Sequence, residues 1–320
     1  MERGYGRIGK VGQMHLPVFC GGDTMYLAID LGGTYIKRAF FEQGNWFAHE
    51  QIKTPATKRE LLALISSWAG RDGIKGIAVS SPGTVTKHGS IEGTSAIPYI
   101  HEGHLLQEIE RATGLSVSIE NDACCAALAE VWKGNGVDCK DVAVIVIGTG
   151  IGGALIKDGQ LHRGFDLLGG ELGYTLLSID PVQRTAVPFS EMASASAIAR
   201  RYATWTGQPG DRLTASDVFA AYEAGDHAAK KAIDAFYFCL AAGIHNVHYV
   251  YNPEKILLGG GISARDDLLD GVRHAYMQLK DQLSDYTLHM PRFERCHFQG
   301  NANLIGAMHH FMQQQGQQWR

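Results

Sequence analysis

The sequence predicts an α/β fold made of two lobes of similar architecture with a cleft between them. Residues 26–50 and 142–162 share one plan, in which an apolar strand, a glycine-rich turn and a second strand lead into a tight turn. Helical and strand patterns alternate along the rest of the chain, which is typical of α/β proteins. The chain has 320 residues, more than one hydrophobic core usually organises. The repeated plan therefore indicates two lobes.

Each repeat carries its own turn signals. Gln43-Gly44 in the first and Asp158-Gly159 in the second predict tight hairpins. The apolar period of 3.6 residues then predicts helices over residues 59–69, 104–113, 123–133, 191–205, 215–224, 227–249, 264–283 and 302–314. The longest ends before Asn252-Pro253, because proline does not continue a helix. A buried strand from Lys255 to Leu258 follows and enters Gly259-Gly260-Gly261.

The composition excludes several classes of function. With 29 basic and 33 acidic residues and a formal charge of −4, the chain offers no cationic face for nucleic acid or a membrane surface. No apolar run approaches the ~20 residues of a membrane helix. Six cysteines without paired spacing favour reduced thiols and a cytoplasmic location. Residues 1–24 show no periodicity and predict a disordered extension, with Met25 opening the folded part.

Two glycine motifs imitate nucleotide-binding fingerprints without their structural context. Gly4 to Lys10 nearly matches a P-loop, but Val11 follows where Ser or Thr is required, and no strand precedes it. Gly148, Gly150 and Gly153 match the dinucleotide pattern, but a hairpin strand follows instead of a helix. Neither motif predicts a P-loop or Rossmann site.

The turns of the two repeats nevertheless suit phosphate groups. Consecutive backbone N–H groups at Gly32-Gly33-Thr34 and at Gly148-Thr149-Gly150 can surround phosphate oxygens. The alternative is that these glycines only permit tight turns, but their matching positions favour a nucleotide clamp. A third glycine-rich turn, in residues 256–263, would let a flat ring or a ribose approach the backbone, or would simply connect a strand to a helix.

Five motifs together resemble the ROK family of sugar kinases and sugar-responsive repressors, within the actin-like ATPase superfamily. They are AIDLGGT (28–34), IENDACCAALAE (119–130), IGTGIGGALI (147–156), GGELGY (169–174) and LLGGGIS (257–263). The resemblance covers nearly all of residues 25–315. It implies a two-lobed actin-like (ribonuclease H-like) fold with ATP in the cleft. We expect a sugar and phosphate lobe of residues 25–138 plus 302–320, a nucleotide lobe of residues 139–301, and a homodimer.

The resemblance also implies the residues that bind ATP and Mg²⁺. Asp30 would help to hold the ATP-bound Mg²⁺ through water. The remaining ATP contacts would come from the glycine-rich turns: Gly32, Gly33, Thr34, Gly148, Thr149 and Gly150 at the phosphates, and Gly260 and Gly261 at the adenosine.

On the sugar side, the resemblance implies that Asn121, Asp122 and Glu171 bind hydroxyls, and that Asp122 is the general base. The chemistry agrees, because phosphoryl transfer needs a base beside the nucleophile. Asp122 precedes a predicted helix whose dipole favours an ionised carboxylate. The alternative is that Asn121 and Asp122 cap this helix, worth roughly 1 kcal/mol, and both roles can hold together.

The sequence departs from the family where many members bind a structural zinc. Tyr174 replaces the histidine ligand, and residues 175–190 contain no Cys or His. Since structural zinc needs about four N or S ligands, we expect none. An acidic residue that contacts the sugar in the family is also displaced: Ser190 takes its place, with Glu191 one position away.

These departures are similar to those of β-glucoside kinases, and a site relaxed at the anomeric side would admit a sugar substituted at its first carbon. We therefore expect ATP-dependent phosphorylation of a hexose or hexoside hydroxyl, the 6-hydroxyl being preferred. Glucokinase and N-acetylmannosamine kinase are alternative activities, and an inactive sugar sensor is the non-enzymatic one. The 24-residue extension is too short for the DNA-binding domain of a repressor.

Overall fold

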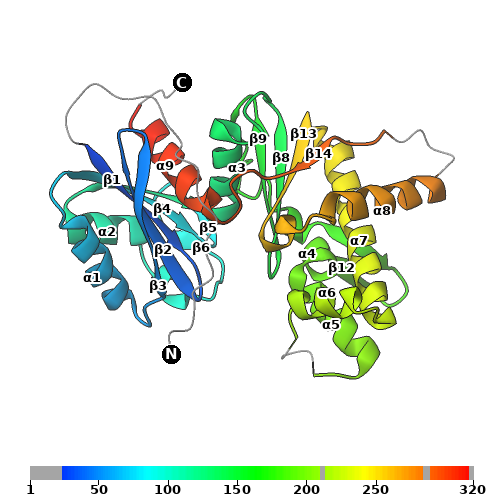
Figure 1. The fold of residues 1–320 in the computed structure, drawn as a ribbon. Helices are drawn as coiled ribbons and strands as arrows, with labels where there is room; N and C mark the ends of the chain where they lie inside the picture. The colour runs from blue at the N-terminus through cyan, green and yellow to red at the C-terminus, as the bar shows by residue number, and fades with distance from the viewer. Residues whose placement is uncertain (1–23, 210–212, 284–288, 317–320) are drawn as a thin grey trace.

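Two five-stranded sheets form the cores of two lobes in the computed structural model, which describes residues 24–209, 213–283 and 289–316 (Figure 1). The first sheet has the order β3-β2-β1-β4-β7 and the second the order β10-β9-β8-β13-β14. In each sheet three antiparallel strands are followed by two that are added in parallel. The two sheets therefore share one topology, which confirms the repeated plan of the sequence and the α/β fold.

The strands of the first sheet are β1 (Met25–Leu31), β2 (Tyr35–Glu42), β3 (Asn45–Lys53), β4 (Ile74–Ser81) and β7 (Ser116–Asn121). Those of the second are β8 (Val142–Ile147), β9 (Ile151–Lys157), β10 (Gln160–Leu161), β13 (Lys255–Gly259) and β14 (Phe293–Arg295). Two small hairpins are formed by β5 (Thr84–Val85) with β6 (Ile91–Glu92), and by β11 (Leu176–Asp180) with β12 (Thr185–Pro188).

Both predicted hairpin turns are present. Gln43 and Gly44 have φ of 47° and 84°, and Asp158 and Gly159 have φ of 51° and 77°. Two consecutive residues with positive φ give the turn that matches the twist of antiparallel strands. Both turns therefore form where the sequence predicts them.

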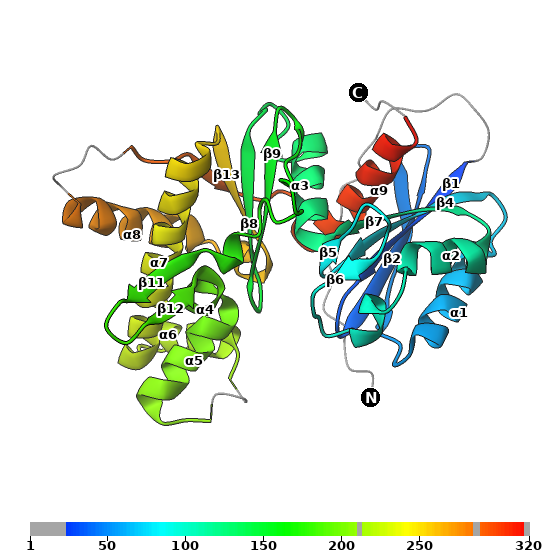
Figure 2. The ribbon, with the colours of Figure 1, turned by 180° about the vertical axis from the view of Figure 1, so that it is seen from behind.

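Helices cover the two faces of the first sheet, as the alternation along β1 dictates. Leu27 and Ile29 point to the core formed with α1 (Lys58–Ala69) and α2 (Leu105–Thr113). Ala28 points to the opposite face, which packs against α9 (Ala302–Gln314). Figure 2 shows α1 and α2 on one side of this sheet and α9 on the other.

The last helix lies very close to α3 (Asp122–Lys133), and glycines make this possible. A Cβ added at Gly306 would come within 1.7 Å of the Cys125 carbonyl oxygen, and one at Gly76 within 2.2 Å of the Phe311 ring. Because neither backbone nor a buried ring can give way easily, these positions exclude any side chain. α9 thereby joins α3 to β4, although these elements are distant in sequence.

The second lobe is covered by α4 (Phe189–Ala193), α5 (Ala195–Thr206), α6 (Ala215–Glu223), α7 (His227–Tyr251) and α8 (Leu268–Gln282). The helix expected over residues 191–205 is divided, because Ser194 is extended and caps α5 by accepting from the Ala197 N–H. The helix expected from residue 264 begins only at Leu268, after a 3₁₀ turn over Gly261–Ala264. α7 ends at Tyr251, before Asn252-Pro253, as predicted.

Some sequence features lie outside the described residues, namely the P-loop-like run from Gly4 to Lys10 and Cys20. In the part of the chain that the structure describes, the other five cysteines are free thiols. No helix among these residues has the length and apolar character needed to cross a membrane.

Candidate functional site

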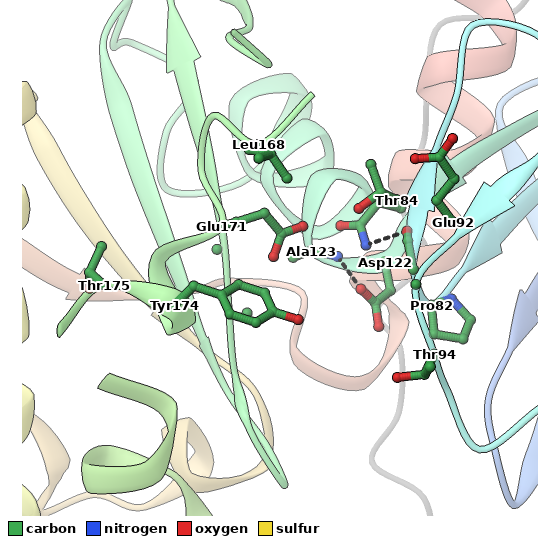
Figure 3. A pocket seen from close by; sticks show the side chains of 15 residues that line it. Pro82, Thr84, Glu92, Thr94, Asp122, Ala123, Leu168, Glu171, Tyr174 and Thr175 are labelled. Atoms are coloured by element: carbon green, nitrogen blue, oxygen red, sulfur yellow. Dashed lines mark hydrogen bonds between the residues drawn. The ribbon is translucent and has the colours of Figure 1, made fainter. Parts of the chain in front are cut away.

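A cavity of about 750 Å³ opens between the two lobes and collects the predicted sugar-binding residues (Figure 3). Asn121 and Asp122 line it from the first lobe, and Glu171, Leu168 and Tyr174 from the second. Figure 3 shows Glu171 and Tyr174 extending from one wall toward Asp122 on the other. The structure therefore brings Glu171 together with the adjacent residues Asn121 and Asp122, from which it is distant in the sequence.

The passage from β7 into α3 holds Asn121 and Asp122 in different ways. Asn121 is the N-cap of α3, because its Oδ1 accepts from the Cys124 N–H at 3.0 Å. Its Nδ2 donates to the carbonyl of Gly83 at 3.1 Å, which ties the cavity wall to this junction. Asp122 is the first helical residue, and its Oδ1 accepts from the Ala123 N–H at 2.7 Å. The cap is thus supplied by Asn121, and Asp122 is not needed for it.

The environment of Asp122 favours its protonated form. The pKa of Asp122 is raised to about 6, chiefly by burial; the hydrogen bond from the Ala123 N–H opposes the rise, and the charges of Asp30 and Glu171 contribute to it. Burial also raises the pKa of Glu171. Three carboxylates therefore share this part of the cleft, and Asp122 has the proton affinity of a base that works near neutral pH.

Asp30 is buried at the end of β1 and is held by polar side chains from three other elements. Its Oδ1 accepts from Ser80 Oγ and from Asn303 Nδ2, both at 3.0 Å. Lys37 Nζ lies 3.9 Å from its Oδ2. Lys37 was not singled out from the sequence, although the hairpin register pairs it directly with Asp30, so the strand alternation could have found it.

The two glycine-rich turns expected to bind phosphate, Gly32-Gly33-Thr34 and Gly148-Thr149-Gly150, are exposed, but only the second lines another cavity. Thr34 and Thr149 are both solvent-exposed. Gly148 and Thr149 line a cavity of about 460 Å³ in the second lobe, together with Gly261. As the described residues form these two cavities, neither is lined by Asp30 or by Gly32-Gly33-Thr34.

The glycines after β13 have different tasks. A Cβ added at Gly261 would meet nothing within 4 Å, so this backbone faces the open space of the second cavity. Gly260 has φ of 86°, and its Cβ would come within 2.3 Å of the Ile147 carbonyl oxygen. Gly260 is thus required by a strained turn and a close approach, and Gly261 leaves room for a ligand.

Arg265 closes the second cavity beside Phe219, and sequence reasoning missed both. The guanidinium lies 4.0 Å from the centre of the Phe219 ring. It also pairs with Glu223 at 3.1 Å and with Asp267 at 2.8 Å. A flat, charged and aromatic wall of this kind can stack on a planar base. No motif of the sequence marks this wall, because α6 and the segment from Arg265 to Asp267 meet only in the fold.

A buried ion pair joins the lobes beneath the first cavity. Glu120 is fully buried and pairs with Arg163 from the second lobe. Its Oε1 accepts from the Asn121 N–H at 2.6 Å. Because a buried carboxylate without a partner is costly, Arg163 stabilises the strand end that carries Asn121 and Asp122. No sequence motif marks Arg163, because its partner Glu120 lies on β7 of the other lobe.

Ser190 and Glu191, at the place where the family has an acidic residue that contacts the sugar, both make contacts within the second lobe. Ser190 Oγ accepts from the Ile151 N–H at 2.9 Å and so supports the second glycine turn. Glu191 pairs with Arg200 at 2.5 Å. Neither side chain lines the first cavity as the described residues form it. Within the same residues, no group of three His, Cys, Asp or Glu side chains is arranged to hold a metal ion.

The chain matches known proteins over most of its length. The model of the ROK family matches residues 26–314. A β-glucoside kinase of Listeria monocytogenes is 33% identical, over 90% of this chain and 97% of its own length. A β-glucoside kinase of Klebsiella pneumoniae is 34% identical, over 89% and 95%. A solved structure of a ROK family protein from Streptococcus pneumoniae in complex with sucrose has a TM-score of 0.83 and 34% identity, covering 92% of this chain and all of that one.

The raised pKa of Asp122 makes a prediction about stability in the absence of ligands. In the unfolded chain the carboxyl has its ordinary pKa near 3.8, and in the folded protein about 6, so this group makes the folded state less stable as pH rises through that interval. Asp122→Asn removes the cost. We expect the free energy of unfolding at pH 7.5 to rise by about 1–2 kcal/mol, and to change little at pH 4.

Urea unfolding of parent and variant at both pH values measures this difference. Asp270→Asn is the matched control, because this carboxylate lies on the surface of α8. A variant that is no more stable than the parent at pH 7.5, or equally stabilised at both pH values, would contradict the raised pKa.

Proposed function

The chain belongs to the ROK family, and from this membership we propose an ATP-dependent kinase that phosphorylates a β-glucoside, preferably at the 6-hydroxyl, with Asp122 as the general base. Carbohydrate kinase activity follows from the close relatives over nearly the whole chain. The observation that carries the proposal is the inter-lobe cavity, in which Asp122 faces Glu171 and has a pKa raised to about 6.

In the proposed reaction, Asn121 and Glu171 bind sugar hydroxyls and orient the one that reacts. Asp122 accepts the proton of that hydroxyl as the hydroxyl oxygen bonds to the terminal phosphorus of ATP. The bond between this phosphorus and its bridging oxygen breaks, and ADP leaves. A sugar hydroxyl is a poor nucleophile at neutral pH, and a positioned base contributes about 10²–10⁴ in rate. The pKa near 6 keeps Asp122 ionised at neutral pH and still basic enough to take the proton.

The second lobe would hold the nucleotide. Thr149 and Gly150 would donate backbone N–H groups to the phosphates, opposite Gly32, Gly33 and Thr34. The Gly148 N–H donates to the Gly150 carbonyl at 2.9 Å and so holds the shape of this turn. Gly261 faces open space beside the Phe219 and Arg265 wall, which fits an adenosine. Asp30 would hold Mg²⁺ through water, and bound Mg²⁺ neutralises phosphate charge. Lys37 beside Asp30 would add positive charge where three carboxylates otherwise repel a phosphate.

The choice of a β-glucoside rests on the relatives. The Listeria and Klebsiella proteins are named β-glucoside kinases. The Streptococcus protein is in complex with sucrose, whose glucose unit is also substituted at its anomeric carbon, but in the α configuration.

We propose one lobe of residues 25–138 with 302–320 and another of residues 139–301, of which residues 210–212, 284–288 and 317–320 lie outside the described part of the chain. A cytoplasmic enzyme without a nucleic-acid partner is consistent with the formal charge of −4.

ATP consumption with Asp122→Asn tests the proposed activity and its base together. The amide keeps the acceptor for the Ala123 N–H but cannot take a proton. We expect the parent to convert cellobiose and simple β-glucosides to sugar phosphates. The variant should lose a factor of about 10²–10⁴ in kcat, while it still binds ATP. Coupled measurement of ADP and identification of the phosphorylated carbon by NMR are the readouts.

Each alternative gives a different result in this assay. A glucokinase or an N-acetylmannosamine kinase would prefer the free sugar to its glycosides, and a sugar sensor would bind sugar without consuming ATP. A variant that keeps more than about a tenth of the parent kcat would reject Asp122 as the base. Asp270→Asn should match the parent throughout.

We also propose that the chain carries no structural zinc. Tyr174 stands where a histidine would be a ligand, and residues 175–190 form the β11–β12 hairpin without Cys or His. Elemental analysis of the dialysed protein should find zinc far below one atom per chain. EDTA should stop turnover, and added Mg²⁺ alone should restore it. The melting temperature should not change with EDTA, because only the removal of a structural zinc would lower it. One zinc per chain after dialysis would contradict this proposal.

A further inference from the structure

We propose that Tyr174 and Leu168 form a subsite for the group attached to the anomeric carbon of the substrate, and that this subsite selects an aromatic or sugar ring as that group. The inference rests on the proposed function, since it concerns the β-glucosides accepted by the same cavity.

The cavity is larger than the reacting sugar needs. Its volume of about 750 Å³ is typical of sites that enclose a drug-sized ligand, whereas a single hexose is much smaller. The polar groups assigned to the reacting sugar, Asn121, Asp122 and Glu171, occupy only part of the wall. On the side of the second lobe, Leu168 and Tyr174 are the two large side chains of the remaining wall, which also includes Gly152, Gly153 and Thr175.

These two side chains are exposed although they are large and mainly apolar. Leu168 is 63% and Tyr174 79% exposed. Exposed apolar groups gathered at a cavity commonly mark a ligand site. The Tyr174 ring extends over the cavity with its hydroxyl directed toward the Asp122 wall (Figure 3). It therefore offers an apolar face and a polar tip, the combination that suits a ring with hydroxyls on its edge.

One short segment fixes the backbone of both residues relative to Glu171. The Glu171 N–H donates to the Leu168 carbonyl at 3.1 Å, and the Tyr174 N–H donates to the Glu171 carbonyl at 3.2 Å. A Cβ added at Gly173 would come within 2.1 Å of the Ile151 carbonyl oxygen, so the backbone of this segment packs closely against β9. Leu168, Glu171 and Tyr174 are thus carried by one hydrogen-bonded segment, which places a group bound by Tyr174 beside a sugar bound by Glu171.

The chemistry of a pyranose directs the anomeric substituent toward this segment. If the 6-hydroxyl gives its proton to Asp122, the anomeric carbon lies on the other side of the ring oxygen. An equatorial substituent there extends away from the 6-hydroxyl. The wall opposite Asp122 carries Glu171, with Leu168 and Tyr174 on either side of it in the chain. A ring joined to the anomeric oxygen would therefore reach the Tyr174 face.

The test compares substrates that differ only in this group: glucose, methyl β-glucoside, phenyl β-glucoside and cellobiose. For Tyr174→Ala, we expect the ratio of kcat/KM for phenyl β-glucoside to that for glucose to fall about tenfold, mainly through KM. Loss of an aromatic contact supports a change of this size. Tyr174→Phe should retain most of the ratio for the phenyl glycoside and lose more for cellobiose. Leu168→Ala should lower both ratios less.

Ile179→Ala is the matched control, because Ile179 is 66% exposed on β11 and does not line the cavity as the described residues form it. It should leave every ratio unchanged. An unchanged ratio in Tyr174→Ala, or equal losses for glucose and phenyl β-glucoside, would overturn the subsite while the kinase activity stands. A change of oligomeric state in Tyr174→Ala, seen by light scattering with an unchanged ratio, would assign the exposed ring to a contact between copies instead. A parent that phosphorylates none of these sugars would reject the proposed function and the subsite with it.

Discussion

The passage from β7 into α3 is the constraint on which the arrangement of the site depends. Three consecutive residues have three tasks there: Glu120 pairs with Arg163 from the other lobe, Asn121 caps the helix, and Asp122 lines the cavity. The buried pair and the cap fix the backbone on both sides of Asp122. A helix that began one residue earlier would rotate Asp122 by about 100° about the helix axis and turn it away from the cavity.

Electrostatics then decides what Asp122 can do. Its carboxylate is removed from water and lies near the charges of Asp30 and Glu171, and both effects favour the proton. The same crowding of negative charge opposes the approach of phosphate. Lys37, paired with Asp30 across the hairpin, and the backbone N–H groups of the two glycine turns are the features of this chain that offset it. The proposed ATP site and the proposed base therefore depend on one another.

The sequence predicted those parts of the molecule that are encoded locally. Asp158-Gly159 and its counterpart in the first repeat gave both hairpins, and the repeated plan gave the common topology of the two sheets. The ends of helices were predicted less well. The break at Ser194, for example, depends on one side-chain cap within a continuous apolar period. The sequence did not predict Arg163 or Arg265, because Arg163 pairs with Glu120 and Arg265 contacts Phe219 and Glu223, all of them distant in sequence. The sequence shows Tyr174 only as the replacement of a zinc-binding histidine, and its exposure at the cavity is evident only from the fold.

The dependence of kcat/KM for the sugar on pH tests the role of Asp122 most directly, because this ratio reports the ionisation of the protein before the sugar binds. A carboxylate that must be ionised to accept the proton loses activity as pH falls through its pKa, which is raised to about 6, chiefly by burial. The account predicts that log kcat/KM is level above pH 7 and falls with a slope of one below an apparent pKa near 6. A kcat/KM that stays level down to pH 5, in protein shown by circular dichroism to remain folded, would contradict it.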